Sequence, residues 1–247
     1  MEQLLKTDRP GVVWMGNDGW LLWDGARLLA TDLDLHSAER LSPPPGDLSL
    51  LAQRLELLML THAHDDHFRM ETCRMLAEQG SCRFLIPESC REKARPLPQE
   101  RVQYVKPGDS LSLAGAEIAC VRAIHGHIQG SVYSGASLLD CGYRLRFGGS
   151  TFYQPGDTLL LEEHLSMEPV DVLFVSPTEH NTWVEDSLRL IGQLSPKRIL
   201  AQHFGTYREH PGNLFWAHGY TRELRDALSP EQQARYHIPE QGAAVPL

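Results

Sequence analysis

The chain has 247 residues, of which 42% are hydrophobic and 22% charged, and this composition is ordinary for a soluble globular protein. The formal net charge of −9 argues against a nucleic-acid partner, because binding a phosphate backbone requires a basic surface. The first residues lack the apolar core of a secretion signal, and no apolar run approaches the roughly 20 residues of a membrane helix. Five cysteines without a CxxC pair indicate reduced thiols. We therefore expect one cytoplasmic domain over residues 1–247, without a membrane partner.

The first third of the chain is predicted to form paired strands. Short apolar runs at Gly11–Gly16, Gly19–Trp23 and residues 26–30 are separated by Asx-Gly turns, which favour hairpins. The compact run at residues 57–60 is typical of a strand buried on both faces. Apolar residues at helical spacing over residues 70–77 then predict a helix.

The middle of the chain is again rich in predicted strands, and the last third alternates strands with helices. Strands are expected at residues 102–105, 111–113, 118–124, 143–147, 151–153, 172–175 and 199–201. Helices are expected over residues 184–194 and 216–227, where apolar side chains recur at helical spacing. Interleaved strands and helices in both halves suggest an α/β fold with two sheets packed face to face and helices outside.

The most informative segment is the hexapeptide at residues 62–67, which has the sequence His-Ala-His-Asp-Asp-His. It directly follows an apolar strand, and a loop at a strand end is where such sheets place reactive groups. His62 and His64 are two residues apart and can chelate one ion, while Asp66 and His67 can turn toward a second. Imidazole and carboxylate are typical ligands of zinc, manganese and iron(II). The alternative is a polar surface loop, which the preceding apolar strand disfavours.

One hexapeptide cannot saturate two ions, so further ligands must come from elsewhere in the chain. Three residues qualify because each follows an apolar run: His125, Asp157 and His203. A repeated pattern of strand followed by ligand can bring side chains together at one sheet edge. His127 lies two residues after His125 and competes with it for this role, although His125 is preferred because it ends the strand.

Together these motifs resemble the metallo-β-lactamase superfamily: His-x-His-x-Asp-His, a strand-ending histidine, Gly-Asp-Thr at residues 156–158, and a final strand-ending histidine. The resemblance spans roughly residues 12–207. Finer features are similar to the L-ascorbate-6-phosphate lactonase branch, namely residues 105–109, 153–158, 171–177 and 196–207. The resemblance implies a four-layer αββα sandwich of two mixed sheets.

The resemblance also implies a site for two divalent metal ions, with zinc the first choice and manganese or iron as alternatives. By the family pattern, the first ion's ligands would be His62, His64 and His125. The second ion's ligands would be Asp66, His67 and His203, and Asp157 would bridge both ions. A shared hydroxide would then attack an electrophilic carbonyl or phosphorus. Asp66 and Asp157 are therefore the candidate catalytic residues.

Five further polar residues are candidates for binding substrate: Asn17, His127, His180, Asn181 and Tyr207. Asn17 stands where the family usually has a polar pair near the first strand. Tyr207 could protonate a leaving group or simply pack, and His180 and Asn181 could equally lie in a solvated loop. Trp216 and the other tryptophans singled out are expected in the core.

The leading functional expectation is hydrolysis of a small-molecule ester or lactone, with a phosphorylated sugar lactone suggested by the branch. A phosphodiesterase or nuclease on the same two metals is one alternative, which the acidic charge disfavours. A non-catalytic ligand-binding domain is another, which the apparently complete ligand set disfavours. A di-iron redox role is disfavoured because His64 stands where that branch typically has glutamate. A homo-oligomer is left open.

Overall fold

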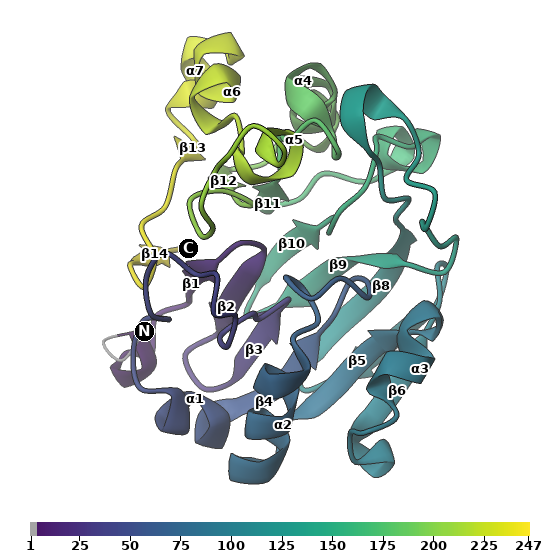
Figure 1. Ribbon diagram of the computed structural model, residues 1–247. Coiled ribbons are helices and arrows are strands. Elements are labelled where there is room, and N and C mark those ends of the chain that lie inside the picture. The colour runs from purple at the N-terminus through teal and green to yellow at the C-terminus, as the bar shows by residue number, and fades with distance from the viewer. Residues whose placement is uncertain (1–3) are drawn as a thin grey trace.

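The computed structural model describes residues 4–247 and contains two seven-stranded sheets packed face to face (Figure 1). The first sheet has the strand order β14 (Ala244–Pro246), β1 (Gly11–Gly16), β2 (Gly19–Trp23), β3 (Leu28–Thr31), β4 (Leu55–Met59), β5 (Arg83–Pro87) and β6 (Val102–Val105). The second sheet has the order β13 (Tyr236–His237), β12 (Arg198–Ala201), β11 (Val172–Val175), β10 (Ser150–Gln154), β9 (Cys141–Phe147), β8 (Ala116–Arg122) and β7 (Ser110–Leu113).

Both sheets are mixed. In the first, β3, β4, β5 and β6 pair in parallel, whereas β1 and β2 pair in antiparallel with their neighbours. In the second, β10 to β13 are parallel and β7 to β10 are antiparallel. The parallel strands matter for the site, because their carboxyl ends lie at one edge of each sheet.

Helices cover the outer face of each sheet. The first sheet carries α1 (Leu48–Arg54), α2 (Met70–Gln79) and α3 (Arg91–Ala94). The second half adds α4 (Trp183–Leu194), α5 (Leu214–Ala217), α6 (Thr221–Ala227) and α7 (Pro230–Gln233). Short 3₁₀ turns occur at Leu4–Lys6, Glu88–Cys90, Gln99–Arg101, Ile128–Gly130 and Glu162–Ser166. The α/β four-layer sandwich of the metallo-β-lactamase type is therefore confirmed.

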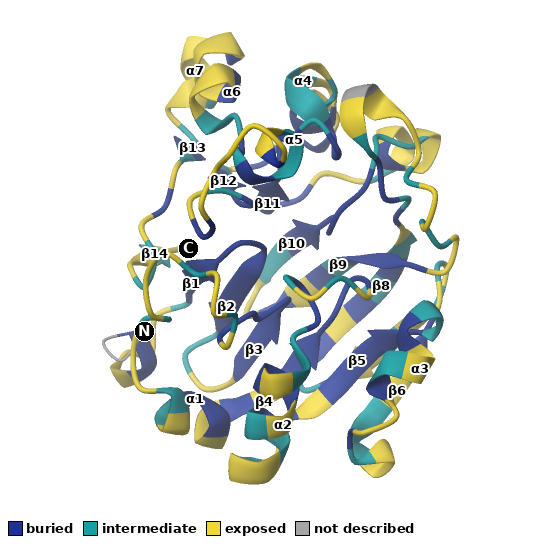
Figure 2. Cartoon of the chain, in the orientation of Figure 1, coloured by how far each residue is buried: buried dark blue, intermediate teal, exposed yellow. Residues whose placement is uncertain are grey.

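The strand sequences explain the layering. Alternate side chains of a strand point to opposite faces of its sheet. In β1, Val12 and Trp14 join the core between the sheets, while Val13 and Met15 join the core beneath the helices. Both faces are buried, so the strand is apolar at consecutive positions. Figure 2 shows the same contrast, with buried strands inside and exposed outer faces on the helices.

The predicted helix over residues 216–227 is wrong, because the chain breaks it into α5 and α6. Gly219 (φ +72°) and Tyr220 (φ +43°) adopt left-handed backbone conformations that end a right-handed helix. A Cβ at Gly219 would lie 2.3 Å from that of Phe204, so the close packing of this corner requires glycine. Elements α1, β5, α3, α7, β13 and β14 were not predicted from the sequence. None of the helices within residues 4–247 combines the length and apolarity needed to cross a bilayer.

Candidate metal centre

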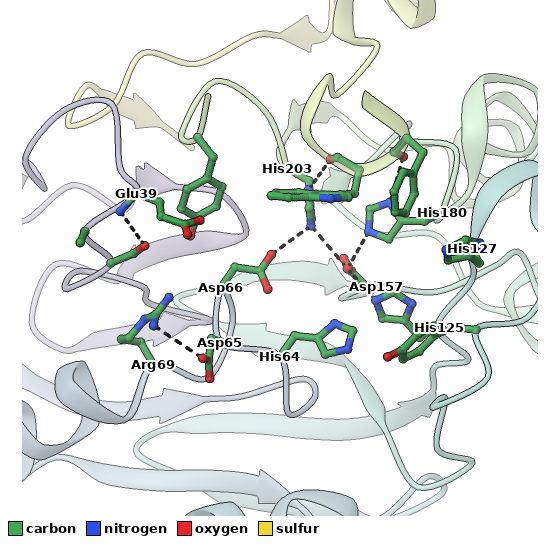
Figure 3. A pocket seen from close by; sticks show the side chains of 16 residues that line it. Glu39, His64, Asp65, Asp66, Arg69, His125, His127, Asp157, His180 and His203 are labelled. Atoms are coloured by element: carbon green, nitrogen blue, oxygen red, sulfur yellow. Dashed lines mark hydrogen bonds and ion pairs between the residues drawn. The ribbon is translucent and has the colours of Figure 1, made fainter. Parts of the chain in front are cut away.

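The site lies where strand ends of the two sheets meet. The hexapeptide at residues 62–67 begins three residues after β4 ends. Asp157 follows β10, and His203 follows β12 two strands away in the same parallel set. His125 follows β8, which ends at Arg122 rather than at the predicted residue 124. Figure 3 shows His64, Asp66, His125, Asp157 and His203 converging on one cavity.

The structure brings all seven predicted ligand residues together. Three overlapping groups each place one possible ligand atom per residue within 4.8 Å of the others. These groups are His62, His64 and His125; His62, His67 and Asp157; and Asp66, His67 and His203. The first and third groups consist of the same residues as the two predicted ligand sets, and the second joins Asp157 to one histidine of each set. His180 forms a further such group with His125 and Asp157.

Asp157 stands at the centre of the imidazoles. Its Oδ2 atom faces the Nε2 atoms of His180 at 2.9 Å, His125 at 3.3 Å, His203 at 3.4 Å, His67 at 3.5 Å and His62 at 4.0 Å. One carboxylate oxygen thus lies among the imidazoles of both histidine groups. Asp66 Oδ2 lies 3.6 Å from the Nε2 atoms of both His67 and His203.

Backbone carbonyl oxygens fix the orientation of two imidazoles through their Nδ1 atoms. His203 Nδ1 lies 3.0 Å from the carbonyl oxygen of Trp216, and His125 Nδ1 lies 2.6 Å from that of Gly126. A carbonyl oxygen only accepts hydrogen bonds, so each neutral ring must carry its proton on Nδ1 and keep a lone pair on Nε2. These lone pairs point into the site, where a metal ion can accept them.

Unpartnered buried atoms test whether a cation fits. The Nε2 atoms of His62, His67 and His203 are buried without a hydrogen-bond partner in the described part of the chain. Buried polar atoms normally have partners, because desolvating one without compensation costs roughly 1–3 kcal/mol. Three such nitrogens beside two carboxylates therefore fit a site for divalent cations with mixed imidazole and carboxylate ligands.

Burial and neighbouring carboxylates shift the pKa values of the histidines in the site. Burial opposes protonation of His203, but Asp157, Asp18 and Asp66 outweigh it and raise the pKa of His203 to about 9. Burial lowers the pKa of His180 to about 4, so this ring is neutral at pH 7. The negative charge of the buried carboxylates is thus balanced by protons, and a bound cation would displace these protons.

Two buried aspartates support His67. Asp32 Oδ2 accepts from His67 Nδ1 at 2.9 Å and from Thr61 Oγ1 at 2.6 Å, while its Oδ1 accepts from Thr61 N at 2.8 Å. Asp18 Oδ2 lies 3.8 Å from the same Nδ1, and burial raises the pKa of Asp18 to about 7. Sequence reasoning gave neither aspartate a role at the site. For Asp32 a signal existed, because it directly follows β3, the parallel neighbour of β4.

Three of the five predicted substrate-binding residues hold the carboxylates in place. Asn17 donates to Asp66 Oδ2 at 3.1 Å, and Asn181 donates to Asp157 Oδ1 at 3.0 Å. His180 contacts Asp157 from the other side, at the 2.9 Å given above. The predicted turn that contains Asn17 is buried, because the Asn17 side chain reaches into the site instead of solvent.

A cavity of about 530 Å³ opens over these groups, which is a size suited to a small molecule. Its lining comprises Ser37, Ala38, Glu39, His64, Asp65, Asp66, Arg69, His125, His127, Tyr133, Asp157, His180, His203, Tyr207, Phe215 and Trp216. The expectation that Trp216 belongs to the core is wrong, because the short α5 turns it to the cavity half-buried. Tyr133 and Phe215 were not predicted, and no periodic pattern marks them.

The two remaining predicted substrate residues, His127 and Tyr207, both line this cavity. The His127 ring packs on Phe215 with 5.0 Å between centroids. The Tyr207 hydroxyl donates to Asp34 Oδ2 at 2.5 Å, so its proton is engaged by a carboxylate outside the predicted ligand set.

Comparison with known proteins places these features in a family. The sequence profile described as "Beta-lactamase superfamily domain" matches residues 28–204, which is more than half of the chain. An uncharacterized protein of Mycobacterium tuberculosis is 25% identical over 231 residues, covering 83% of this chain and 61% of the relative. The chain thus spans about three fifths of that relative's length. A metal-dependent hydrolase of Pyrococcus furiosus is 23% identical over 205 residues, covering 79% of this chain and 85% of the relative.

Solved structures share the fold at low identity. A metallo hydrolase from Ignicoccus hospitalis has a TM-score of 0.68 at 19% identity and covers 96% of this chain and 98% of its own. An isothiocyanate hydrolase from Delia radicum gut bacteria has a TM-score of 0.71 at 16% identity, covering 95% and 98%. A diiron β-hydroxylase from Streptomyces venezuelae has a TM-score of 0.74 at 14% identity, covering 97% and 54%. Since the fold is shared by hydrolases and a β-hydroxylase, function must be argued from the site.

Proposed function

Because the chain belongs to the family described as "Beta-lactamase superfamily domain", we propose that it is a metal-dependent hydrolase that cleaves a neutral small-molecule ester or lactone. The Pyrococcus furiosus and Ignicoccus hospitalis proteins, a metal-dependent hydrolase and a metallo hydrolase, support the reaction class. The observation that carries the proposal is the set of unpartnered Nε2 atoms on His62, His67 and His203 around Asp157.

The proposed metal ligands are the seven residues named above, and two divalent ions are proposed, with zinc preferred over manganese or iron. When bound, the ions would supply a nucleophile from water at neutral pH and polarise the attacked carbonyl. Asp66 and Asp157 are the proposed catalytic residues, because their carboxylates face the space between the histidines and can accept the proton of the attacking water. Asn17 and Asn181 keep these two carboxylates oriented through their amide N–H groups.

Charges in the cavity favour a neutral substrate over a phosphorylated one. Arg69 is the one arginine among the lining residues given above, which include no lysine, and its guanidinium is already paired with Asp34 at 3.0 Å and Asp65 at 3.7 Å. Lys93 also pairs with Asp65, at 2.6 Å. A phosphate ester needs unpaired cations or N–H groups to hold it. We therefore place a plain ester or lactone ahead of a phosphorylated sugar lactone, and the net charge of −9 places it ahead of a nucleic-acid phosphodiester.

The test is a substrate panel with metal-loaded protein. We expect turnover of aliphatic lactones and p-nitrophenyl esters that is lost on chelation and restored by zinc, with two ions per chain by elemental analysis. Asp157→Asn should abolish turnover, whereas Asp171→Asn, in which the changed carboxylate pairs with Lys197 near the start of β11, should not. Turnover of bis(p-nitrophenyl) phosphate without any ester or lactone activity would contradict the proposal. Fewer than two ions in unchelated protein would favour a ligand-binding domain instead.

A further inference from the structure

One wall of the cavity is aromatic and continuous. The rings of Tyr133 and His127 are nearly parallel with 6.4 Å between centroids, and His127 is 5.0 Å from Phe215. Tyr133 and His127 belong to the loop between β8 and β9, whereas Phe215 belongs to α5. Gly126 allows the loop to lie this close, because a Cβ there would be 2.4 Å from the carbonyl oxygen of His180. Two segments distant in sequence thus build one aromatic surface beside the reacting groups.

The opposite side of the cavity is polar. Figure 3 shows Glu39, Asp65 and Arg69 on one side of the carboxylates of Asp66 and Asp157, and His127 on the other. A substrate with one polar and one apolar end would therefore have a single favourable orientation, because burying its apolar end against charged groups would leave them desolvated.

Exposed apolar residues flank the members of the aromatic wall along the chain. Ile128 is 41% exposed and Val132 61% exposed, and they are the sequence neighbours of His127 and Tyr133. Leu214, next to Phe215, is 39% exposed. Among the described residues, four of the eight exposed large apolar side chains lie within residues 128–139. This concentration in one loop differs from the single scattered apolar residues that any protein surface carries, and exposed apolar surface of this kind often marks a binding site.

We propose that these residues form a subsite for an apolar arm of the substrate, an acyl chain of about six to ten carbons or an aryl group of similar size. The proposal rests on the hydrolase function proposed above and adds the substrate class. The arm would lie against Tyr133, His127 and Phe215, with the ester or lactone carbonyl over Asp66 and Asp157. A substrate arm is favoured because the apolar surface begins inside the cavity, beside the histidines, and an external partner would not reach that part.

The experiment uses the zinc-loaded full chain and two readouts. The first is kcat/KM for p-nitrophenyl esters from acetate to decanoate. The second is calorimetric binding of the corresponding carboxylates, which does not require turnover. Each buried methylene contributes up to about fourfold in affinity, so we expect a rise of about threefold per methylene in both series up to about eight carbons. The rise in kcat/KM should come mainly through KM.

Variants of the aromatic wall test whether this wall causes the rise in affinity and kcat/KM with chain length. Phe215→Ala and His127→Ala should each lower the octanoyl-to-acetyl ratio about tenfold in both readouts, and Phe215→Leu should retain most of it. Leu165→Ala is the matched control, because Leu165 is also an exposed apolar residue at 45% but does not line the cavity. It should leave the ratio unchanged. His127→Ala guards against misfolding of Phe215→Ala, since His127 lies in a surface loop.

The outcomes separate this inference from the hydrolase function. Chain-length-dependent carboxylate binding that both alanine variants flatten would support the subsite even if no ester were hydrolysed. Hydrolysis with a flat chain-length profile in both readouts would overturn the subsite while leaving the hydrolase standing. A rise that Phe215→Ala and His127→Ala both leave unchanged would also overturn it.

Discussion

Replacing Asp32 by asparagine tests whether the site depends on the orientation of His67. The carboxylate of Asp32 accepts three hydrogen bonds, one from His67 Nδ1 and two from Thr61. An amide of the same size has only one acceptor atom. If its oxygen faces Thr61 N, its NH₂ meets the Nδ1–H of His67. If it is turned over, its NH₂ meets the backbone N–H of Thr61, which cannot rotate away.

The first arrangement changes the proton position on His67, a proposed metal ligand. His67 would avoid the clash by moving its proton to Nε2, the atom that faces Asp157 at 3.5 Å. The lone pair proposed to bind metal would then be lost in the dominant tautomer. Removing a carboxylate partner of this kind typically weakens metal binding 10- to 100-fold, which corresponds to about 1.4–2.7 kcal/mol. The second arrangement instead lowers the free energy of unfolding by about 1–3 kcal/mol through an unpaired buried donor.

The assay is competition for zinc between the protein and a chromophoric chelator, with urea unfolding of the metal-free chain alongside. Asp171→Asn is the matched control, since Asp171 likewise accepts from the backbone N and Oγ1 of one threonine, Thr151, but lies at the opposite end of the parallel strands. The control should keep the zinc affinity of the wild type. A zinc Kd for Asp32→Asn within twofold of wild type, together with unchanged unfolding, would refute the reasoning.

Three other outcomes concern stability, each read as an unfolding free energy from urea titration. Gln202→Leu leaves the indole N–H of Trp20 unpaired in the core and should cost about 2–4 kcal/mol; an unchanged midpoint would contradict the contact. Gly192→Ala in α4 meets no atom within 4 Å and should add about 1 kcal/mol. Gly126→Ala should instead cost about 1–3 kcal/mol, because its Cβ would press on the His180 carbonyl; a gain there would show that the loop moves freely.

Much of the fold was predictable because its signals are local. Nearly continuous apolar runs mark the strands buried on both faces, as in β1 and β11, and helical spacing marks α2 and α4. The predicted closing helix failed for a tertiary reason. Gly219 packs against Phe204, and that close approach determines a left-handed corner which apolar spacing cannot reveal. The short edge strands β13 and β14 depend on their partners, so their sequences carry little signal of their own.

The site likewise has features that the sequence determines and features that only the tertiary structure determines. Sequence alone determined the set of metal-ligand candidates, because histidines and aspartates at fixed spacing after apolar strands are a property of the chain itself. Only the tertiary structure determined which nitrogen of His203 faces the site, since the carbonyl of Trp216 that holds its Nδ1 is 13 residues away. The same holds for Asp32 behind His67, 35 residues apart, and for the aromatic wall shared by the loop after β8 and α5. Spacing along the chain constrains neighbours, whereas burial, proton placement and pocket shape arise from contacts that form only when distant segments pack together.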